Sequence, residues 1–439
     1  MNCDFNLWEF FMSKTEWVDP AKRNFRTVPD RKYLAKNTPG VSLVDYAPQI
    51  DMAGVRAYRL KRVQDELKRA GLPAILLFDA VNMRYASGIA LEQVQQQRHP
   101  YRGLIVSAEK GCIAFSRDHW RPMLPALETI TEIRPSDANM SKSGPAAVQS
   151  ASLWAKDIAQ ILREHGEHDL RLPVDRLPAI AISALLKEGI KIMDADSIMY
   201  AARAIKSPDE ITLFSIAISV GEAGAFKMRE ALRPGVTENE VFSHLHQTNI
   251  AMGGEWCDLR LAKSGGGTNP GLQEHSDRRV RAGDLFHFDT DMIGPFGTFV
   301  DFSRTFFCGP GRPSDKQRDM YKLAVEHIEH NLSIIKAGVT IGEIVDKCFR
   351  LPSNCIKGRY MSMMHGFGLT YDYPSIRYPY DYDGTGKDEP LHEYMTLCVE
   401  ALIAPDDDAE AVKLEQQILV TEGGYQLLST FPYEEKLLL

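Results

Sequence analysis

The sequence predicts a mixed α/β protein with two folded domains, and three observations lead to this prediction. The first is an alternation of helical and strand patterns between residues 51 and 204. The second is a strong helix start at Ser207-Pro208-Asp209-Glu210, where an N-cap serine, a proline and a glutamate form a capping box that marks a boundary. The third is a Gly-Val-Thr-x-x-Glu segment that occurs twice after this boundary.

The region before the boundary divides into an arm and a domain. Residues 1–50 show little periodicity and contain several prolines, so we expect an arm that lies over the surface or over a partner subunit. Residues 55–69 carry apolar side chains at helical spacing, which predicts an amphipathic helix that Gly71 ends. Apolar runs at 74–78, 103–106 and 112–115 have the length of strands. These elements predict an α/β domain over residues 51–204.

The second domain is expected over residues 205–439 and opens with a long apolar stretch that predicts a core helix. Two further capping boxes, Thr237–Glu240 and Thr340–Glu343, lie in the repeated segments at 233–241 and 336–344. The repetition is either a coincidence, because capping boxes are common, or the mark of a duplicated half-domain. In the second case a site would lie between the halves, where ligand clefts often form.

Composition places the chain among globular proteins. Hydrophobic residues make up 44% and charged residues 25%, which excludes a disordered or fibrous class. The net charge of −8 argues against nucleic-acid binding based on bulk basicity. The seven cysteines lack Cys-x-x-Cys spacing, and no secretory signal or run of about 18 uncharged apolar residues is present. We therefore expect a cytoplasmic protein with reduced thiols and no membrane association.

The strongest chemical signal is a group of three carboxylates, Asp289, Asp291 and Asp301, in an otherwise apolar segment. Charged side chains in an apolar strand are unfavourable unless they are paired or bound to metal. Period-2 alternation puts Asp289 and Asp291 on the same face of one strand. Residues 294–297, Gly-Pro-Phe-Gly, suit a hairpin turn that would return Asp301 beside them. The alternative is that these residues cap turns or pair with Arg304.

Three further polar residues, His365, Glu400 and Glu415, lie in apolar runs. Gly366 and Gly368 follow the histidine and would allow backbone or a ligand to approach closely. A single histidine of this kind is usually a core residue. Together, however, three aspartates, one histidine and two glutamates are the oxygen-rich set that holds a pair of divalent cations. The ligand types do not select among Fe, Mn, Zn, Co and Ni.

The order Asp, Asp, His-Gly-x-Gly-Leu, Glu, Glu-x-x-x-Leu-Val-Thr-x-x-Gly resembles the pita-bread metallopeptidases, which include prolidase, aminopeptidase P and the metal-free relative creatinase. The resemblance implies a pita-bread catalytic domain with pseudo-two-fold halves after a creatinase-like α/β domain. Within the latter, VNMRYASG at 81–88 resembles the family's strand-and-turn motif. The implied metal ligands are Asp289, Asp291, Asp301, His365, Glu400 and Glu415.

Two positions depart from the peptidases. Thr290 stands where they usually place the first metal aspartate, and Asp372 stands where they keep a second histidine that contacts the scissile amide. The chain is more similar to the metallopeptidase-like dimethylsulfoniopropionate lyases, which release dimethyl sulfide from a small sulfonium zwitterion and leave acrylate. The similar segments are FDTDMIG, GGEWCDLRLAKSGGGTNPGLQE, MHGFGL and TLCVEALI. This likeness implies that both acids flanking Thr290 bind metal and that Tyr360 is an active-site tyrosine.

A metal-dependent lyase that acts on a small onium carboxylate is the function we predict. Two metal ions would bind the carboxylate, and a base would take the adjacent proton. Where the lyases carry Asp-Glu this chain carries Tyr371-Asp372, and we predict Asp372 as the base, with Tyr371 as the alternative. Tyr360 would hold the cationic end of the substrate.

A cluster of tyrosines gives an independent hint about the ligand. Seven of the sixteen tyrosines lie near His365 in sequence, and aromatic faces attract onium cations. A tyrosine-rich surface loop or dimer contact would give the same pattern. The alternative functions are an Xaa-Pro metallopeptidase of the prolidase or aminopeptidase P type, a creatinase-like hydrolase, and a binding protein on the same fold. The family likeness and the proline-rich arm favour a homodimer.

Overall fold

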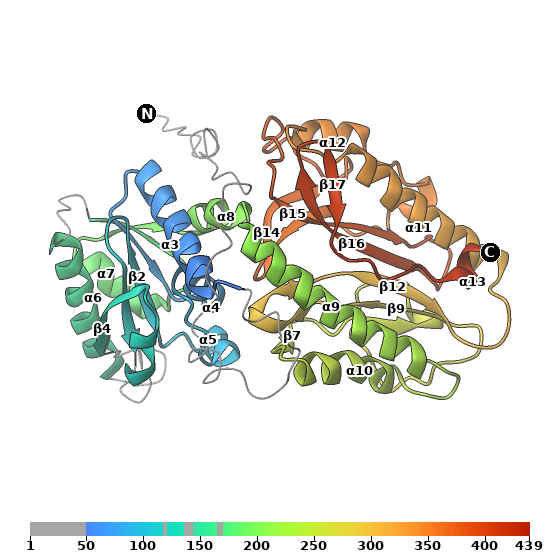
Figure 1. Cartoon of the computed structure of the whole chain (residues 1–439), viewed down its shortest axis with the longest axis horizontal. Coiled ribbons are helices and arrows are strands. Elements are labelled where there is room, and N and C mark those ends of the chain that lie inside the picture. The colour runs from blue at the N-terminus through green and yellow to red at the C-terminus, as the bar shows by residue number, and fades with distance from the viewer. Residues whose placement is uncertain (1–49, 117–120, 136–143, 145, 165–169) are drawn as a thin grey trace. The chain divides into compact units, whose positions relative to one another are not determined.

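The computed structural model describes residues 50–116, 121–135, 144, 146–164 and 170–439, and it divides into two compact units (Figure 1). Among these residues the first unit comprises Asp51–Arg203, and the second comprises Ala204–Leu439 with Ile50. Both units combine helices and strands, which confirms the predicted mixed α/β class. The expected arm lies outside the described residues except for Ile50. The six described cysteines form no disulfide.

The first unit is built on a six-stranded sheet with the order β4-β3-β2-β1-β5-β6. Its strands are β1 (Ala74–Leu77), β2 (Gly103–Ser107), β3 (Cys112–Ser116), β4 (Ile130–Pro135), β5 (Arg171–Val174) and β6 (Lys191–Asp194). Its helices are α3 (Met52–Arg69), α4 (Ala80–Ser87), α5 (Gln93–Arg98), α6 (Ala146–Glu164), α7 (Ala179–Lys187) and α8 (Asp196–Ala204). The predicted helix at 55–69 and the three predicted strands are therefore confirmed as α3 and β1–β3.

One prediction for this unit is wrong. Residues 81–88 were expected to form a strand and turn, but residues 80–87 form helix α4. The side chain of Asp79 accepts hydrogen bonds from the backbone N–H groups of Val81 and Asn82, which is the usual way in which a helix N-terminus is capped. Gly88 ends the helix with a φ of 83°. The N-cap aspartate stands outside the motif on which the resemblance was based, so the motif alone missed it.

The second unit contains three antiparallel sheets and five α-helices in its described residues. The helices are α9 (Pro208–Ala231), α10 (Glu238–Ala251), α11 (Asp315–Ile334), α12 (Ile341–Lys347) and α13 (Glu435–Leu438). Two three-stranded sheets have the orders β11-β10-β7 and β12-β9-β8, and a five-stranded sheet has the order β14-β13-β15-β16-β17. The strands are β7 (Trp256–Cys257), β8 (Ala262–Ser264), β9 (Leu285–Asp289), β10 (Met292–Ile293), β11 (Phe299–Val300), β12 (Ser303–Phe307), β13 (Ser362–Phe367), β14 (Tyr371–Arg377), β15 (Thr396–Ile403), β16 (Val412–Thr421) and β17 (Gly424–Leu427).

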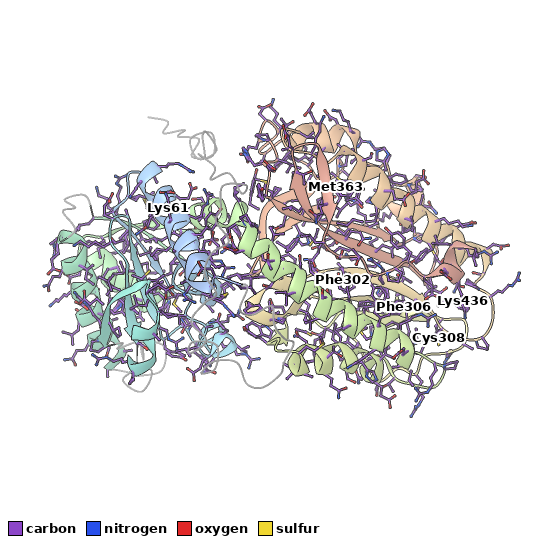
Figure 2. All side chains as sticks on the ribbon, viewed as in Figure 1. Lys61, Phe302, Phe306, Cys308, Met363 and Lys436 are labelled. Carbon is purple, nitrogen blue, oxygen red and sulfur yellow. The ribbon has the colours of Figure 1, made fainter. Side chains whose placement is uncertain are left out.

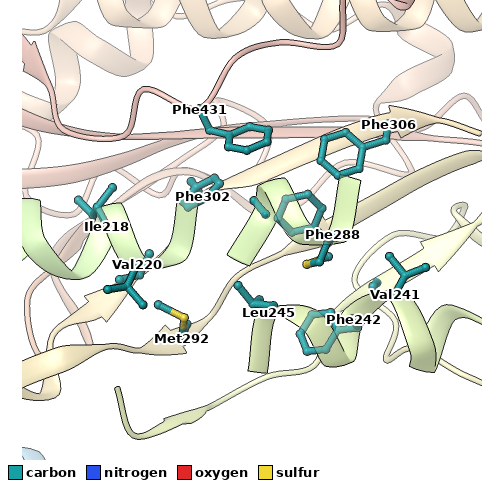
Figure 3. Close-up of a cluster of buried hydrophobic side chains, with 14 of the residues drawn as sticks. Ile218, Val220, Val241, Phe242, Leu245, Phe288, Met292, Phe302, Phe306 and Phe431 are labelled. Carbon is teal, nitrogen blue, oxygen red and sulfur yellow. The ribbon is translucent and has the colours of Figure 1, made fainter. Parts of the chain in front are cut away.

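Helix α9 is the predicted core helix. Ser207 and Glu210 form the expected capping box, each side chain bonding the backbone N–H of the other residue. The length and mean hydropathy of α9 would let it cross a membrane, but half of its most apolar 18-residue stretch is buried within the folded chain. Gly221 lets the helix approach β11 closely, because a Cβ there would lie 2.8 Å from Val300. Figure 3 shows the apolar cluster into which α9 packs, in which Ile218 and Val220 of α9 lie among Leu245, Phe288, Met292, Phe302, Phe306 and Phe431.

The two Gly-Val-Thr-x-x-Glu segments have the same local structure. Thr237 and Thr340 are N-caps of α10 and α12, and each forms its capping box with the glutamate three residues later. The preceding glycines also match, because the N–H groups of Gly235 and Gly338 donate to the carbonyls of Val280 and Leu391, both at 2.8 Å. The repeat therefore extends from sequence to structure, as expected for two related halves. Figure 2 shows that side chains fill the second unit, and Met363 on β13, which it labels, is fully buried.

Candidate metal centre

The structure brings the six predicted ligands together in the interior of the second unit. They come from β9, β13, β15 and β16, from the loop between β9 and β10 and from the connection between β11 and β12, and all are buried: Asp289, Asp291, Asp301, His365, Glu400 and Glu415. Ligand atoms of the three aspartates lie within 4.8 Å of one another. Asp301 also belongs to a second such group with His365, Cys398 and Glu415. The Oε1 atom of Glu400 lies 3.8 Å from Nε2 of His365.

Strand register explains why distant residues meet. In the five-stranded sheet His365 pairs with Cys398, and Glu400 pairs with Glu415. Cys398 and Glu400 are two residues apart on β15, so the side chains of both pairs point to the same face of the sheet. The small sheet joins this face through β12, where the hydroxyl of Ser303 donates to Oε2 of Glu415 at 2.9 Å.

The loop that carries Asp291 corrects one expectation. Asp289 and Asp291 do not share a strand, because β9 ends at Asp289 and Asp291 has a φ of 37°, which residues other than glycine rarely adopt. The hydroxyl of Thr290 fixes this loop by donating to the carbonyl of Val300 and accepting from the N–H of Phe302. Backbone strain of this kind clusters at functional sites. The predicted hairpin is confirmed, since β10 pairs antiparallel with β11 before Asp301.

A buried lysine that sequence reasoning missed lies beside these carboxylates. Lys413 on β16 is 2% exposed, and its Nζ atom lies 2.5 Å from Oε2 of Glu400, 3.0 Å from Oε2 of Glu415 and 3.4 Å from Oδ2 of Asp289. Its position two residues before Glu415 in an apolar strand was a signal that could have revealed it. Burial acts to lower the pKa of Lys413, but the three carboxylates outweigh burial and raise it.

The electrostatics of the carboxylates follow from burial and from two cationic neighbours. Burial raises the pKa of Asp289, Asp291 and Asp301, and it raises that of Glu400 to about 7. Burial also acts to raise the pKa of Glu415, but Lys413 and His365 prevail and lower it to about 2. So many buried acids in one place are costly without further positive charge.

Unpaired oxygens indicate where that positive charge belongs. Among the described residues, one carboxylate oxygen of each of five acids is buried without a hydrogen-bond partner: Asp289 Oδ1, Asp291 Oδ2, Asp301 Oδ1, Glu400 Oε1 and Glu415 Oε1. Buried polar atoms are nearly always satisfied in native proteins. Carboxylate oxygens with one imidazole suit divalent metal ions. The residues present therefore fit a divalent metal centre.

Tyr371 and Asp372 lie on opposite faces of β14. The hydroxyl of Tyr371 donates to Oδ1 of Asp291 at 2.6 Å, and its ring centroid lies 4.8 Å from that of His365. Asp372 is buried, and its Oδ2 accepts a hydrogen bond from Nζ of Lys206 at 3.2 Å. The structure thus brings Tyr371 to the carboxylates, whereas the Asp372 carboxylate pairs with Lys206.

The clustered tyrosines separate in the fold. The ring of Tyr360 faces Lys413, with 5.9 Å between its centroid and Nζ, and Tyr371 lies beside His365. Tyr378 is buried against His327, and Tyr380 packs on the guanidinium of Arg359. Two of the seven tyrosines are thus in contact with residues of the centre. The remainder of the cluster in sequence does not form a single cage.

Comparison with known proteins gives consistent matches for both units. The model of metallopeptidase family M24 matches residues 212–422, and the model of the creatinase/prolidase N-terminal domain matches residues 59–205. The dimethylsulfoniopropionate lyases DddP of Roseobacter denitrificans and Roseovarius nubinhibens are each 32% identical over 395 residues, covering 88% of this chain and of the relative. The solved Xaa-Pro dipeptidase from Bacillus anthracis, 21% identical, superposes with a TM-score of 0.68 over 86% of this chain and 99% of that chain. These matches confirm the predicted family resemblance and fold.

Proposed function

This chain belongs to metallopeptidase family M24, and we propose that it is a metal-dependent lyase that cleaves dimethylsulfoniopropionate, or a similar small onium carboxylate, to dimethyl sulfide and acrylate. The observation that carries the proposal is the likeness to two DddP lyases over 88% of both chains at 32% identity. An Xaa-Pro dipeptidase from Pyrococcus horikoshii is 26% identical over only 59% of this chain. The lyase is therefore better supported than the peptidase.

The proposed cofactor is a pair of divalent metal ions held by Asp289, Asp291, Asp301, His365, Glu400 and Glu415. The unpaired oxygens of the five acids support this assignment. When bound, the ions would act as Lewis acids that bind the substrate carboxylate and acidify the adjacent C–H group. The identity of the metal is not part of the proposal, because these ligand types accept several ions.

The proposed reaction is a β-elimination. A base takes the proton from the carbon next to the carboxylate, the electron pair of that C–H bond forms the new C=C bond, and the C–S bond breaks with its electrons on sulfur. Acrylate and neutral dimethyl sulfide result. The sulfur atom of the breaking C–S bond already carries a positive charge. Dimethyl sulfide therefore leaves as a neutral molecule and needs no proton.

Two tyrosines have proposed roles beside the metal ligands. The hydrogen bond from Tyr371 to Asp291 favours Tyr371 over Asp372 as the side chain that handles a proton at the centre, at its Oη atom. The ring of Tyr371 beside His365 supplies an aromatic face that attracts an onium group, and the predicted contact of Tyr360 with that group would use the face of its ring that does not cover Lys413. The predicted role of Asp372 as the base is the weaker alternative, because Lys206 holds its carboxylate.

Parallel assays of metal-loaded protein test the function. One measures headspace dimethyl sulfide from dimethylsulfoniopropionate, and the other measures cleavage of an Xaa-Pro dipeptide. Gas release without dipeptide cleavage supports the lyase, and dipeptide cleavage without gas contradicts it and favours the peptidase. Protein that binds metal and performs neither reaction would reject this substrate. The cytoplasmic location and the homodimer stay predictions.

A further inference from the structure

Lys413 is a buried cation in the carboxylate cluster that the predicted ligand set does not include. It contacts three acids in the same way, through one oxygen of each carboxylate. Oε2 of Glu400, Oε2 of Glu415 and Oδ2 of Asp289 face its ammonium group. The other oxygen of each of these acids is buried and has no hydrogen-bond partner among the described residues. The lysine therefore contacts one oxygen of each carboxylate and leaves the other oxygen available to bind metal.

The fold holds this lysine in a fixed position. The N–H of Lys413 donates to the hydroxyl of Thr305, and the same hydroxyl donates to the carbonyl of Lys413 at 2.9 Å, which fixes β16 against β12. The ring of Tyr360 covers the ammonium group at 5.9 Å. A lysine side chain anchored at its backbone and enclosed by acids and a ring has little freedom to leave. Its charge is a permanent part of the site.

The charges of the site balance only when Lys413 is included. With metal bound, the acids Asp289, Asp291, Asp301, Glu400 and Glu415 are ionised and His365 is neutral, as metal ligands must be, so the ligands carry five negative charges and Lys413 reduces the total to four. Two divalent cations neutralise four charges, whereas without the lysine one negative charge would stay uncompensated in a buried site. Because the dielectric constant of a buried site is low, one uncompensated charge there interacts strongly with the neighbouring carboxylates.

We propose that Lys413 is a positioning residue that supplies the fixed positive charge of the metal centre. It orders Glu400, Glu415 and Asp289 before metal binds, and it sets the charge that two divalent ions neutralise. This inference rests on the metal centre of the proposed function but not on the substrate. It concerns the lysine alone, so it can fail while the metal centre stands.

The test compares three variants with the wild-type chain. Lys413→Met removes the charge and keeps much of the side-chain stem, and Lys413→Arg keeps the charge. Lys206→Met is the matched control, because Lys206 is also 2% exposed and pairs with a buried acid, Asp372, in the same unit. Each protein is stripped with EDTA and then titrated with Mn²⁺ alone. Melting temperature and bound Mn²⁺ per chain are measured before and after.

The expected result is specific to the metal-dependent step. Metal-free Lys413→Met should melt several degrees below the metal-free wild type, and Mn²⁺ should raise its melting temperature by several degrees more than it raises that of the wild type. Lys413→Arg should restore the wild-type rise, whereas Lys206→Met should lower both melting temperatures equally. If the melting temperature of Lys413→Met falls below that of the wild type by the same amount with and without Mn²⁺, the proposal is overturned, because an ordinary structural ion pair would give that result.

Two further outcomes keep the inference separate from folding failure and from the function. If metal-free Lys413→Met does not fold, the comparison moves to Lys413→Arg, and fewer bound Mn²⁺ ions in that variant than in the wild type would contradict the proposal. A wild-type chain that binds no Mn²⁺ overturns the metal centre, and this inference with it. A wild-type chain that binds Mn²⁺ but releases no dimethyl sulfide overturns only the proposed substrate.

Discussion

Replacing Tyr371 with phenylalanine removes a single hydroxyl group from the edge of the proposed metal centre. That hydroxyl donates to Oδ1 of Asp291 at 2.6 Å, while the ring packs beside His365 and is retained in the variant. A hydrogen bond to a charged group contributes about 1.5–3 kcal/mol. Because Tyr371 is 38% exposed, water competes for the bond, and we take the lower value. About 1.5 kcal/mol of transition-state stabilisation corresponds to roughly tenfold in kcat/KM, and a group that transfers the proton contributes about 10²–10⁴-fold, so we expect a loss of at least tenfold.

Asp372→Asn is the comparison that separates the two candidates. It leaves the buried ammonium group of Lys206 without the carboxylate that accepts from it. Breaking a buried ion pair costs about 3–5 kcal/mol of unfolding free energy, which lowers the melting temperature by roughly 6–20 °C in a domain of this size. We expect little change in kcat/KM below that temperature, because Asp372 pairs with Lys206 and not with the carboxylate cluster.

The assay is dimethyl sulfide release by metal-loaded protein at a temperature at which both variants are folded, with melting curves recorded alongside. The prediction is a slower Tyr371→Phe enzyme that loses no more than about 1.5 kcal/mol of unfolding free energy, and an active Asp372→Asn enzyme that loses about 3–5 kcal/mol. The reverse pattern would refute the reasoning. Full activity in Tyr371→Phe, together with an inactive Asp372→Asn variant that melts normally and binds metal, would identify Asp372 as the base.

Three further predictions concern the scaffold and the metal. Gly366→Ala should lower the unfolding free energy by about 1–3 kcal/mol in thermal melts, because the added Cβ would lie 2.2 Å from the carbonyl oxygen of Tyr373. Gly423→Ala is the control and should change the unfolding free energy little, because nothing lies within 4 Å of the added Cβ. Equal effects of the two substitutions would refute this prediction. Burial lowers the pKa of His327 to about 3, so below its unfolded value of about 6.5 only the unfolded chain takes up the proton, and metal-free protein should lose roughly 2 kcal/mol of stability between about pH 6.5 and 5. Denaturant unfolding of His327→Gln should show a smaller loss of unfolding free energy over this pH range. The same dependence of unfolding free energy on pH in the variant and the wild type would contradict the role of His327. EDTA should abolish dimethyl sulfide release and lower the melting temperature, and Mn²⁺ should restore both; activity that survives complete metal removal would contradict a metal-dependent lyase.

Much of the site could be predicted because polar residues stand out in apolar strands. The six proposed ligands were identified in this way, and the fold brings them together as a cluster. The alternation of side chains along a strand is a local property, so it places Glu400 or Glu415 on a face without knowledge of the partner strand. The repeated capping boxes were equally local, and both occur in the structure.

The features that were missed depend on contacts between distant segments. The role of Lys413 follows from the approach of β16 to β12 and β15, which no local pattern encodes. Whether Tyr371 or Asp372 meets the carboxylates depends on a register shift in the β13–β14 pair at His365 and Gly366. The positive φ of Asp291 ends the strand that the period-2 pattern extended.

The central claim is that six side chains converge on two divalent metal ions. Anomalous diffraction from crystals grown with Mn²⁺ tests it most directly. We predict two anomalous peaks, both bounded by the carboxylates of the three aspartates and two glutamates, with one of them next to Nε2 of His365. Crystals of Mn²⁺-saturated protein that show no peak there, or peaks only elsewhere on the chain, would contradict the claim.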